Sequence, residues 1–389
     1  MTSEPGIVIV GGGPAGFSAA GAYRAAGGEL DVSLVSAEEH LPYQRPPLTK
    51  ELLRGEAGVD ELPLETQTWF AENRVAVLPD ARAMALDTER QVVRVEGHEE
   101  LTYSACVLAT GSEPARLPVP GGDDPGLHTV RTVEDSLALA RTAGHETVVV
   151  GSGFIGCEAA ASLAMLGSAV TLVSDEPAPQ STRLGNEVGE RLAAWLQEAG
   201  VRMLTGEGVE SFERRGEGWA VSTASAVAEA RTVLIAAGVS PRLDLAEEAG
   251  LSLAGGAVAA DASMRSSSPE VFVAGDIAYA ENAAAGRPLR VEHWGEALRQ
   301  GEVAGSMAAG HQDAWRQAPG FWSQIGDRTL KYVAWGDGYH SVSLEEHGGG
   351  AFTAWYLDEE GVLVGVLTHQ RDEDYERGRE LVEGAATRS

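Results

Sequence analysis

The sequence predicts an α/β protein with two Rossmann-like dinucleotide-binding domains and a C-terminal α+β interface domain. Two glycine motifs support this, GGGPAG at residues 11–16 and GSGFIG at residues 151–156, because each follows a short apolar run and opens an alanine-rich segment. The third observation is a change of character near residue 314, where tryptophan-containing segments of alternating polarity begin. Two such motifs predict two nucleotide sites.

The glycines of each motif have separate physical tasks. The first permits a tight turn, the second lets the backbone approach a pyrophosphate, and the third allows close helix–strand packing, with the helix N-terminus facing the anion. The first motif is expected to contact one dinucleotide through Gly11, Gly13, Pro14 and Gly16. The second is expected to contact another through Gly151, Gly153, Phe154, Ile155 and Gly156.

Each motif is expected inside a strand–helix–strand unit. The first unit is predicted to comprise a strand at Ile7–Val10, a helix at Pro14–Ala26 and a strand at Val32–Val35. The second is predicted to comprise a strand at Thr147–Val150, a helix at Phe154–Leu166 and a strand at Ala169–Val173. The same plan therefore occurs twice in the chain.

A carboxylate that binds a ribose is expected about 20 residues beyond the glycines of such a motif. In the first unit Ser36 lies nearer that place, and Glu38, which lies slightly past it in the acidic pair Glu38 and Glu39, is the predicted ligand. In the second unit Asp175 and Glu176 follow Ser174 and are predicted to do the same.

Three later apolar segments end in glycine or in Gly-Asp, namely Cys106–Gly111, Val233–Gly238 and Val271–Asp276. Ligands of open α/β sheets bind at the carboxyl ends of strands. The predicted contacts are Ala109, Thr110, Gly111, Gly238 and Gly275. If the third segment returns to the first sheet, the first domain comprises residues 1–111 and 239–313, and the second comprises residues 112–238. The C-terminal domain then comprises residues 314–389, where a β element is expected to precede a helix at about Glu373–Glu383.

Composition excludes several classes of protein. The net charge of −29 argues against nucleic acid as a partner. Apolar runs stop well short of the ~20 residues that span a bilayer, and no leader pattern precedes the first strand, so a cytoplasmic protein without membrane contact is expected. Cys106 and Cys157 are predicted to be core residues, because they form neither a redox pair nor a metal-binding spacing, and no metal site is predicted.

Two further segments, HLPYQRPPLTK at residues 40–50 and VEHW at residues 291–294, complete an ordered set of motifs with the two glycine motifs, ATG and AGD. With this set the chain resembles the ferredoxin reductases of the glutathione-reductase-like flavoproteins. That group includes the reductases of ring-hydroxylating dioxygenases and thiolate-haem monooxygenases, and the apoptosis-inducing factors. The resemblance extends to about Gln300 and implies FAD at the first motif and a nicotinamide cofactor at the second.

The resemblance places a set of residues around FAD, namely Ala15, Glu38, Arg45, Lys50, Ala83, Arg131, Asp276 and Trp294. Asp276 ends a predicted strand, where its carboxylate is able to accept hydrogen bonds from ribityl hydroxyl groups. The alternative is a helix N-cap, since Ile277 opens an alanine-rich stretch. Arg45 is suited to bidentate pairing with a phosphate, and the alternative is an ordinary surface arginine.

In relatives of this superfamily the lysine at the position of Lys50 pairs with the glutamate at the position of Glu158. A cation beside the flavin would stabilise its anionic reduced form. The alternative for Glu158 is a first-turn acid that favours the helix dipole. Glu292 and His293 are expected against the flavin and nicotinamide. Trp322 corresponds to a tryptophan that stacks on the nicotinamide, although its surrounding segment differs from the family pattern, and a core or interface aromatic is the alternative.

NADH is favoured over NADPH, because Asp175 and Glu176 are acidic where a 2′-phosphate would favour arginine. Without a redox cysteine pair, electrons from NADH are expected to leave directly from the flavin to a small iron-sulfur ferredoxin that feeds an oxygenase. The expected docking cations are Arg287, Arg290 and Arg299, and the protein is expected to be a monomer or a homodimer. Two alternatives stay open: an NADH oxidase or quinone-type reductase, and a redox binding protein like apoptosis-inducing factor.

Overall fold

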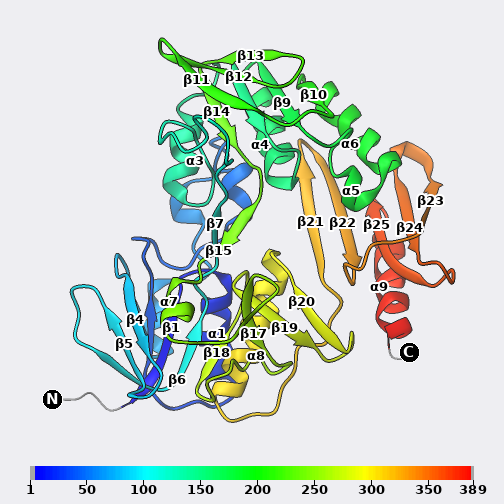
Figure 1. The fold of residues 1–389 in the computed structure, drawn as a ribbon. Coiled ribbons are helices and arrows are strands. Elements are labelled where there is room, and N and C mark those ends of the chain that lie inside the picture. Colours follow the sequence, from blue (N-terminus) through cyan, green and yellow to red (C-terminus); the bar gives the residue numbers. More distant parts are fainter. Residues whose placement is uncertain (1–4, 387–389) are drawn as a thin grey trace.

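The computed structural model describes residues 5–386 (Figure 1). The expectation that no leader pattern precedes the first strand falls partly on residues 1–4, which lie outside this range. Its first sheet has the parallel order β3–β2–β1–β6–β18. These strands are Val75–Leu78, Val32–Val35, Gly6–Val10, Leu101–Leu108 and Val271–Val273. Apolar runs such as Ile7–Val10 are buried, as expected for parallel strands covered on both faces.

Two helices pack closely on the first sheet. They are α1 (Pro14–Ala25) and α8 (Trp294–Ala308). A Cβ atom added to Gly305 of α8 would lie 2.1 Å from the carbonyl oxygen of Ala19 in α1, and one added to Gly301 would lie 2.3 Å from that of Ala15. The two glycines therefore allow the helix backbones to approach each other next to the first glycine motif.

The second sheet repeats the plan in the order β10–β9–β8–β14. Its strands are Arg202–Thr205, Val170–Ser174, Thr147–Val150 and Thr232–Ile235. The helices of this unit are α3 (Val133–Ala140), α4 (Phe154–Met165), α5 (Ser181–Leu184) and α6 (Asn186–Glu198). The predicted strands and helices of both units agree with these bounds to within about one residue.

Each parallel sheet is accompanied by a three-stranded antiparallel meander. In the first unit β4 (Ala83–Asp87) and β5 (Val92–Val95) pair with the start of β6. In the second the meander consists of β11 (Ser211–Arg215), β12 (Gly218–Ser222) and β13 (Val227–Ala230). The repetition extends the likeness of the two units beyond the glycine motifs.

The chain passes between the units through two short strands, β7 (Ser112–Pro114) and β15 (Val239–Pro241), which pair antiparallel with each other. After the second unit the chain returns to the first sheet, where β18 pairs with β6. Ile277 leads into β19 (Ala278–Asn282), so the helix N-cap alternative for Asp276 is wrong. A small sheet contains β19 with β16 (Leu253–Ala254), β17 (Ala257–Ala260) and β20 (Arg287–Arg290).

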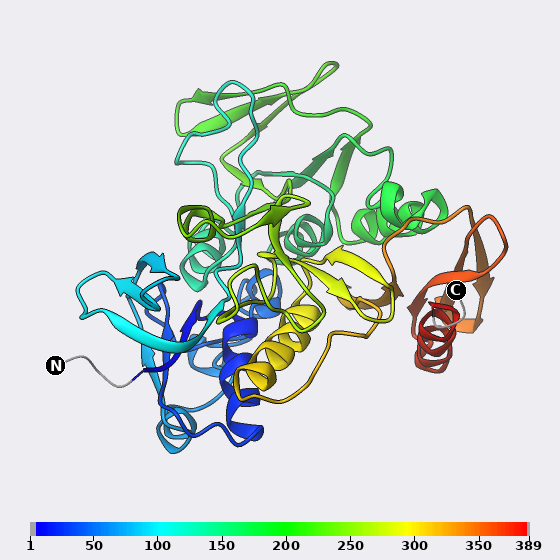
Figure 2. The ribbon, with the colours of Figure 1, turned by 60° about the horizontal axis from the view of Figure 1, so that its bottom comes forward.

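The C-terminal part is an antiparallel sheet of order β21–β22–β25–β24–β23, covered by helix α9. The strands are Gly320–Ile325, Arg328–Ala334, Leu363–His369, Phe352–Leu357 and Ser341–Glu346, and α9 is Asp372–Ala386. Figure 2 shows this orange and red body set to one side of the rest of the chain. The predicted α/β fold class with a C-terminal α+β part is confirmed.

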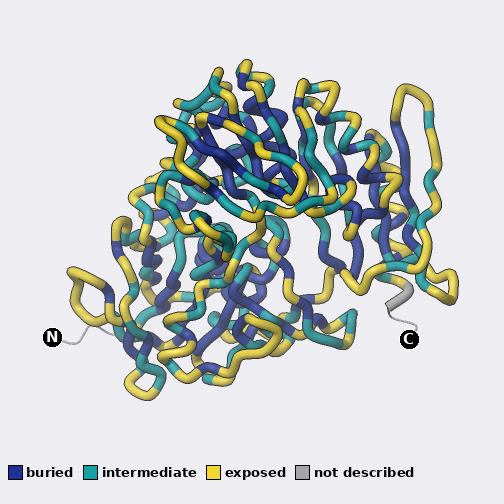
Figure 3. The backbone as a smooth tube through the Cα atoms, turned by 45° about the horizontal axis from the view of Figure 1, so that its top comes forward, coloured by how far each residue is buried: buried dark blue, intermediate teal, exposed yellow. Residues whose placement is uncertain are grey.

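The remaining short helices connect these elements. They are η1 (Pro46–Thr49), η2 (Val59–Glu61), α2 (Gln67–Glu72), α7 (Asp244–Glu248) and η3 (Gly348–Gly350). Burial is concentrated in the sheet strands and the packed helices, whereas the hairpin tips are exposed (Figure 3). None of the helices in residues 5–386 combines the length and apolar character that crossing a membrane requires.

Candidate active site

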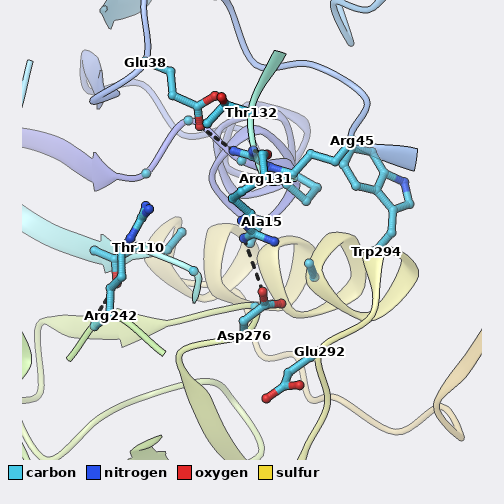
Figure 4. Close-up of a pocket in the computed structure, with 18 of the residues that line it drawn as sticks. Ala15, Glu38, Arg45, Thr110, Arg131, Thr132, Arg242, Asp276, Glu292 and Trp294 are labelled. Atoms are coloured by element: carbon cyan, nitrogen blue, oxygen red, sulfur yellow. Dashed lines mark hydrogen bonds and ion pairs between the residues drawn. The ribbon is translucent and has the colours of Figure 1, made fainter. Parts of the chain in front are cut away.

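A cavity of about 670 Å³ lies at the carboxyl edge of the first sheet and extends to α4 and β21. Figure 4 shows side chains from both sides of this cavity. Most of the predicted site residues line it, namely Gly11, Gly13, Pro14, Ala15, Glu38, Arg45, Lys50, Ala83, Ala109, Thr110, Gly111, Arg131, Phe154, Ile155, Glu158, Gly275, Asp276, Glu292, His293, Trp294 and Trp322. The structure thus brings together residues that lie more than 300 positions apart in the sequence.

The first glycine motif forms a tight turn at one end of the cavity. Gly11 has φ of +132°, and an added Cβ would lie 2.0 Å from the carbonyl oxygen of Ala109. Gly16 does not line the cavity, because it packs beneath the turn, where a Cβ would meet the carbonyl oxygen of Gly11 at 2.0 Å. Gly13 caps α1 and has open space around it, so a ligand is able to approach the backbone there.

The glycines of the second motif repeat this geometry outside the cavity lining, whereas Phe154 and Ile155 of the same motif line the cavity. A Cβ on Gly151 would lie 2.4 Å from the carbonyl oxygen of Ala236, and one on Gly156 would lie 2.0 Å from that of Gly151. Gly153 caps α4. Gly151, Gly153, Gly156, Asp175, Glu176 and Gly238 are absent from the cavity lining. The structure therefore contains two separate turns suited to dinucleotides.

The two acidic candidates of the second unit differ in position. The amide of Gly11 donates to the carbonyl of Val35, and the amide of Gly151 donates to that of Val173, both at 2.8 Å. Val35 and Val173 therefore occupy equivalent positions in the two units. Glu38 lies three residues after Val35 and Glu176 three residues after Val173, so Glu176 is the equivalent of Glu38. Glu176 accepts hydrogen bonds from Ser152 Oγ at 3.4 Å and from the Thr182 amide at 3.2 Å, whereas Asp175 is exposed.

Two partly buried arginines line the cavity, and each has one unsatisfied donor. Arg45 donates to Glu38 Oε1 and to the carbonyl of Arg131, both at 2.6 Å, and is therefore not an ordinary surface arginine. Arg131 donates to Asp276 Oδ2 at 3.3 Å, and burial lowers its pKa. The Nε atoms of both arginines are buried without a partner among the described residues. Cations with free donors at a cavity wall are suited to a diphosphate.

Asp276 keeps acceptor capacity for a ligand. Its Oδ2 accepts hydrogen bonds from Ser112 Oγ at 2.5 Å and from Arg131. Both of these bonds go to the same oxygen, which leaves Oδ1 able to accept from ligand hydroxyl groups. Glu38 is already engaged by Tyr43 Oη at 2.5 Å and by Arg45.

Lys50 and Glu158 form a buried ion pair between the first unit and α4. Lys50 Nζ lies 2.8 Å from Glu158 Oε2, and the side chains are 6% and 8% exposed. Glu158 also accepts from Thr49 Oγ1 at 2.6 Å and from Ser323 Oγ at 2.8 Å. The alternative as a first-turn helix acid is wrong, because the first turn of α4 holds no acidic residue and Glu158 is paired with a cation.

Aromatic side chains close the α4 end of the cavity. Phe321 lies between Phe154, with ring centroids 4.4 Å apart, and His293, with centroids 4.7 Å apart. Trp322 lines the cavity but is 46% exposed. Burial, reinforced by Arg183, lowers the pKa of His293 to about 4, so the imidazole is neutral at pH 7.

Glu292 lines the cavity and pairs with Arg290 at 2.5 Å. The other predicted docking cations are also paired. Arg287 bonds to Asp337, and Arg299 bonds to the fully buried Glu296. The three arginines therefore do not form a free basic cluster.

Sequence reasoning missed several residues that shape the site, namely Thr49, Arg82, Ser112, Thr132, Arg242, Phe321 and Ser323. Arg242 lines the cavity because it directly follows β15, and its carbonyl accepts from Thr110 Oγ1 at 3.0 Å. Thr49 stands in the HLPYQRPPLTK segment, and Phe321 and Ser323 adjoin Trp322 in a segment already singled out, so a signal was available for these three. No local motif contains the other positions.

Both cysteines are buried core residues, as predicted. Loss of solvation raises the pKa of the Cys106 and Cys157 thiols, which makes the reactive thiolate unfavourable. Cys157 donates to the carbonyl of Ser152 at 3.2 Å. Neither residue lines the cavity.

The comparisons with known proteins indicate the same family. The family model described as pyridine nucleotide-disulphide oxidoreductase matches residues 5–301. The anthranilate 1,2-dioxygenase system ferredoxin–NAD(+) reductase component of Burkholderia cepacia is 32% identical over 99% of this chain and 96% of its own length. The rubredoxin-NAD(+) reductase of Pseudomonas putida is 30% identical over 84% of this chain and 85% of its own length.

Solved structures agree with the sequence comparison. The ferredoxin reductase of the CYP199A2 system from Rhodopseudomonas palustris has a TM-score of 0.93 at 27% identity, covering 98% of this chain and 95% of that one. Putidaredoxin reductase in its covalent complex with putidaredoxin has a TM-score of 0.91 at 28% identity, covering 98% and 93%. The chain therefore belongs to the pyridine nucleotide-disulphide oxidoreductase family, among the ferredoxin reductases that its motifs resemble.

Proposed function

We propose that the chain is an NADH:ferredoxin reductase, with FAD in the 670 Å³ cavity and NADH at the second glycine motif. The observation that carries this is the buried Lys50–Glu158 pair, which joins the cavity to the helix of the second motif. The absence of a thiol from the cavity lining supports direct transfer from flavin to an external acceptor.

The residues of the cavity fit FAD along its length. The N-terminus of α1 at Gly13 and the guanidinium groups of Arg45 and Arg131 are suited to the diphosphate. Glu38 would accept from the adenosine ribose, and Asp276 from the ribityl chain. Ala15, Ala83, Thr110 and Trp294 would complete the walls of the site.

Bound FAD supplies the redox chemistry, because it accepts two electrons as hydride and releases them one at a time. Lys50 holds a positive charge at the cavity wall, where its low exposure strengthens its effect on nearby negative charge. Phe154, Phe321 and His293 pack together where the cavity meets α4 and help to exclude water. Glu158 fixes the position of the Lys50 ammonium.

NADH is the preferred donor in this proposal because Glu176 occupies the position equivalent to Glu38. A carboxylate there accepts from the 2′-hydroxyl of NADH and repels the 2′-phosphate of NADPH. Arg183, the nearest basic residue downstream, is exposed on α5 and follows Thr182, whose amide donates to Glu176. Asp175, the other acidic candidate, is displaced from this position by one residue.

The proposed acceptor is a small iron-sulfur ferredoxin that supplies an oxygenase. The names of the relatives support this, since one is a reductase component of a dioxygenase system and one structure holds a reductase with putidaredoxin. Arg287, Arg290 and Arg299 are not proposed as a free basic cluster for docking, because each is paired with a carboxylate.

The test is anaerobic reduction of the flavoprotein with NADH and, separately, with NADPH, followed by mixing with ferredoxins, a quinone and oxygen in turn. The proposal expects rapid flavin reduction by NADH and faster transfer to a ferredoxin than to quinone or oxygen. Fast reaction with quinone or oxygen and none with any ferredoxin would instead establish an oxidase or quinone reductase. A long-lived reduced complex with every acceptor would favour a redox binding protein.

A further inference from the structure

Glu158 accepts hydrogen bonds from two segments that lie far apart in the sequence. Its Oε2 accepts from Thr49 Oγ1 at 2.6 Å and from Lys50 Nζ at 2.8 Å. Its Oε1 accepts from Ser323 Oγ at 2.8 Å and from the Gln324 amide at 3.1 Å. A carboxylate has about four lone-pair sites, so its acceptor capacity is filled from opposite sides.

The register of β21 explains why Ser323 reaches this carboxylate. Ser323 is 1% exposed and pairs with the buried Leu330 of β22, whereas the preceding Trp322 is 46% exposed and pairs with Lys331. Side chains alternate between the two faces of a strand, so a slip of one residue would exchange the hydroxyl for an indole or an amide. Figure 1 shows β21 beside α4, which carries Glu158.

Burial makes each donor to Glu158 important. The carboxylate forms an ion pair with Lys50 and has almost no access to water. Charge-assisted hydrogen bonds replace the lost hydration, and removal of one donor leaves a buried charge poorly satisfied. The two donors from β21 also fix Oε1, so that Oε2 stays directed at Thr49 and Lys50.

We propose that Ser323 and the Gln324 amide are positioning groups for the Lys50–Glu158 pair, so that the C-terminal sheet completes the site of hydride transfer. This rests on the proposed function. Ser323 acts through Glu158 on the orientation of the Lys50 ammonium. The expected effect is therefore on the rate of flavin reduction, with little effect on the binding of NADH.

The test compares the flavoproteins of wild type, Ser323→Ala, Ser323→Thr, Glu158→Gln and the Ser323→Ala/Glu158→Gln double variant in stopped-flow reduction by NADH, without ferredoxin. Ser323→Ala is expected to lower the limiting rate about tenfold, with the dissociation constant for NADH within about twofold. Ser323→Thr, which keeps the hydroxyl group, is expected to recover most of the rate. In the Glu158→Gln background Ser323→Ala should cause little further loss.

Thr368→Ala is the matched control, because Thr368 is a buried hydroxyl residue of the same sheet, on β25, 1% exposed, and lies outside the cavity. It is expected to leave the rate unchanged. The proposal is overturned if Ser323→Ala keeps the wild-type rate, or if its loss is equally large in the Glu158→Gln background.

The midpoint potential of the bound flavin gives a readout that does not depend on turnover. A positioning role requires Ser323→Ala to shift this potential in the same direction as Glu158→Gln, and an unchanged potential would contradict it. If NADH fails to reduce the wild-type flavin, the proposed function fails, and the comparison of potentials still tests the role of Ser323.

Discussion

At the scale of single residues, Glu176 and Asp175 are neighbouring carboxylates with different surroundings. Glu176→Ala is expected to lower kcat/KM for NADH by about 10- to 100-fold, because a hydrogen bond to a charged group contributes ~1.5–3 kcal/mol, and to raise kcat/KM for NADPH, because the repulsion of the 2′-phosphate is removed. Steady-state kinetics with both nucleotides measures this. Asp175→Asn, which changes the exposed neighbour, is the control. A larger effect from Asp175 than from Glu176 would contradict the assignment.

His293 is expected to make stability dependent on pH. Its pKa is lowered to about 4 by burial, while the unfolded chain has the ordinary value near 6.5. Between these values the unfolded state binds more protons, so the free energy of unfolding falls as pH decreases from about 6.5 to 4. The contribution is at most about 3 kcal/mol.

Chemical denaturation across this pH range measures the effect, with His293→Gln as the comparison. The difference in free energy of unfolding between wild type and variant is expected to shrink as pH falls. Arg183 and Asp276 act on His293 with opposite signs and are retained in both proteins. A difference that stays constant from pH 7 to 4 would show that His293 does not titrate in this way.

The residues of the site were predictable to different extents. At Gly11 the positive φ and the nearby Ala109 carbonyl require glycine, and at Gly13 the open space lets a ligand approach the backbone, so the motif alone places both residues. Ser323 was not predictable, because its role depends on the register of β21 and on the approach of that strand to α4. Arg242 reaches the cavity only through the pairing of β7 with β15.

At the scale of elements, the contact between α1 and α8 depends on two glycines. Gly305→Ala is expected to lower the free energy of unfolding by about 3 kcal/mol, because its Cβ would lie 2.1 Å from a carbonyl oxygen of α1. Gly21→Ala in α1 is the matched control, since its Cβ would meet only Trp69 at 3.9 Å. That change is expected to stabilise by ~0.5–1 kcal/mol. Equal effects in denaturant unfolding would rule out close packing as the cause.

The elements around the two glycine motifs were predicted well, whereas strands of two or three residues were not. The strand Val32–Val35 and the helix beginning at Pro14 have apolar runs, a proline at the helix start and flanking glycines that define them. The strands β7, β15 and β16 contain only two or three residues, too few for periodicity to appear. Their pairing comes from tertiary contacts between segments more than 100 residues apart in the case of β7 and β15.

At the scale of the whole molecule, the net charge of −29 governs the approach of a partner. An acidic ferredoxin is expected to be reduced faster when ionic strength rises from 0.01 to 0.15 M, since the Debye length falls from about 30 to 8 Å and weakens the repulsion. Stopped-flow oxidation of the reduced flavoprotein measures the rate. An uncharged quinone, the control, should show little salt dependence. A rate that falls with salt would reveal a local basic surface that steers docking.

The pairing of strands β7 and β15 also has a consequence for the folding of the chain. Because Ser112 lies opposite Pro241 and Pro114 opposite Val239, the whole intervening segment leaves and re-enters the first unit at one point. In the folding of the first sheet, this segment acts as a surface loop whose ends are held together by the β7–β15 pair. The entropic cost of closing such a loop grows only slowly with its length. The second unit is therefore accommodated there with little topological penalty to the strands β6 and β18 of the first sheet.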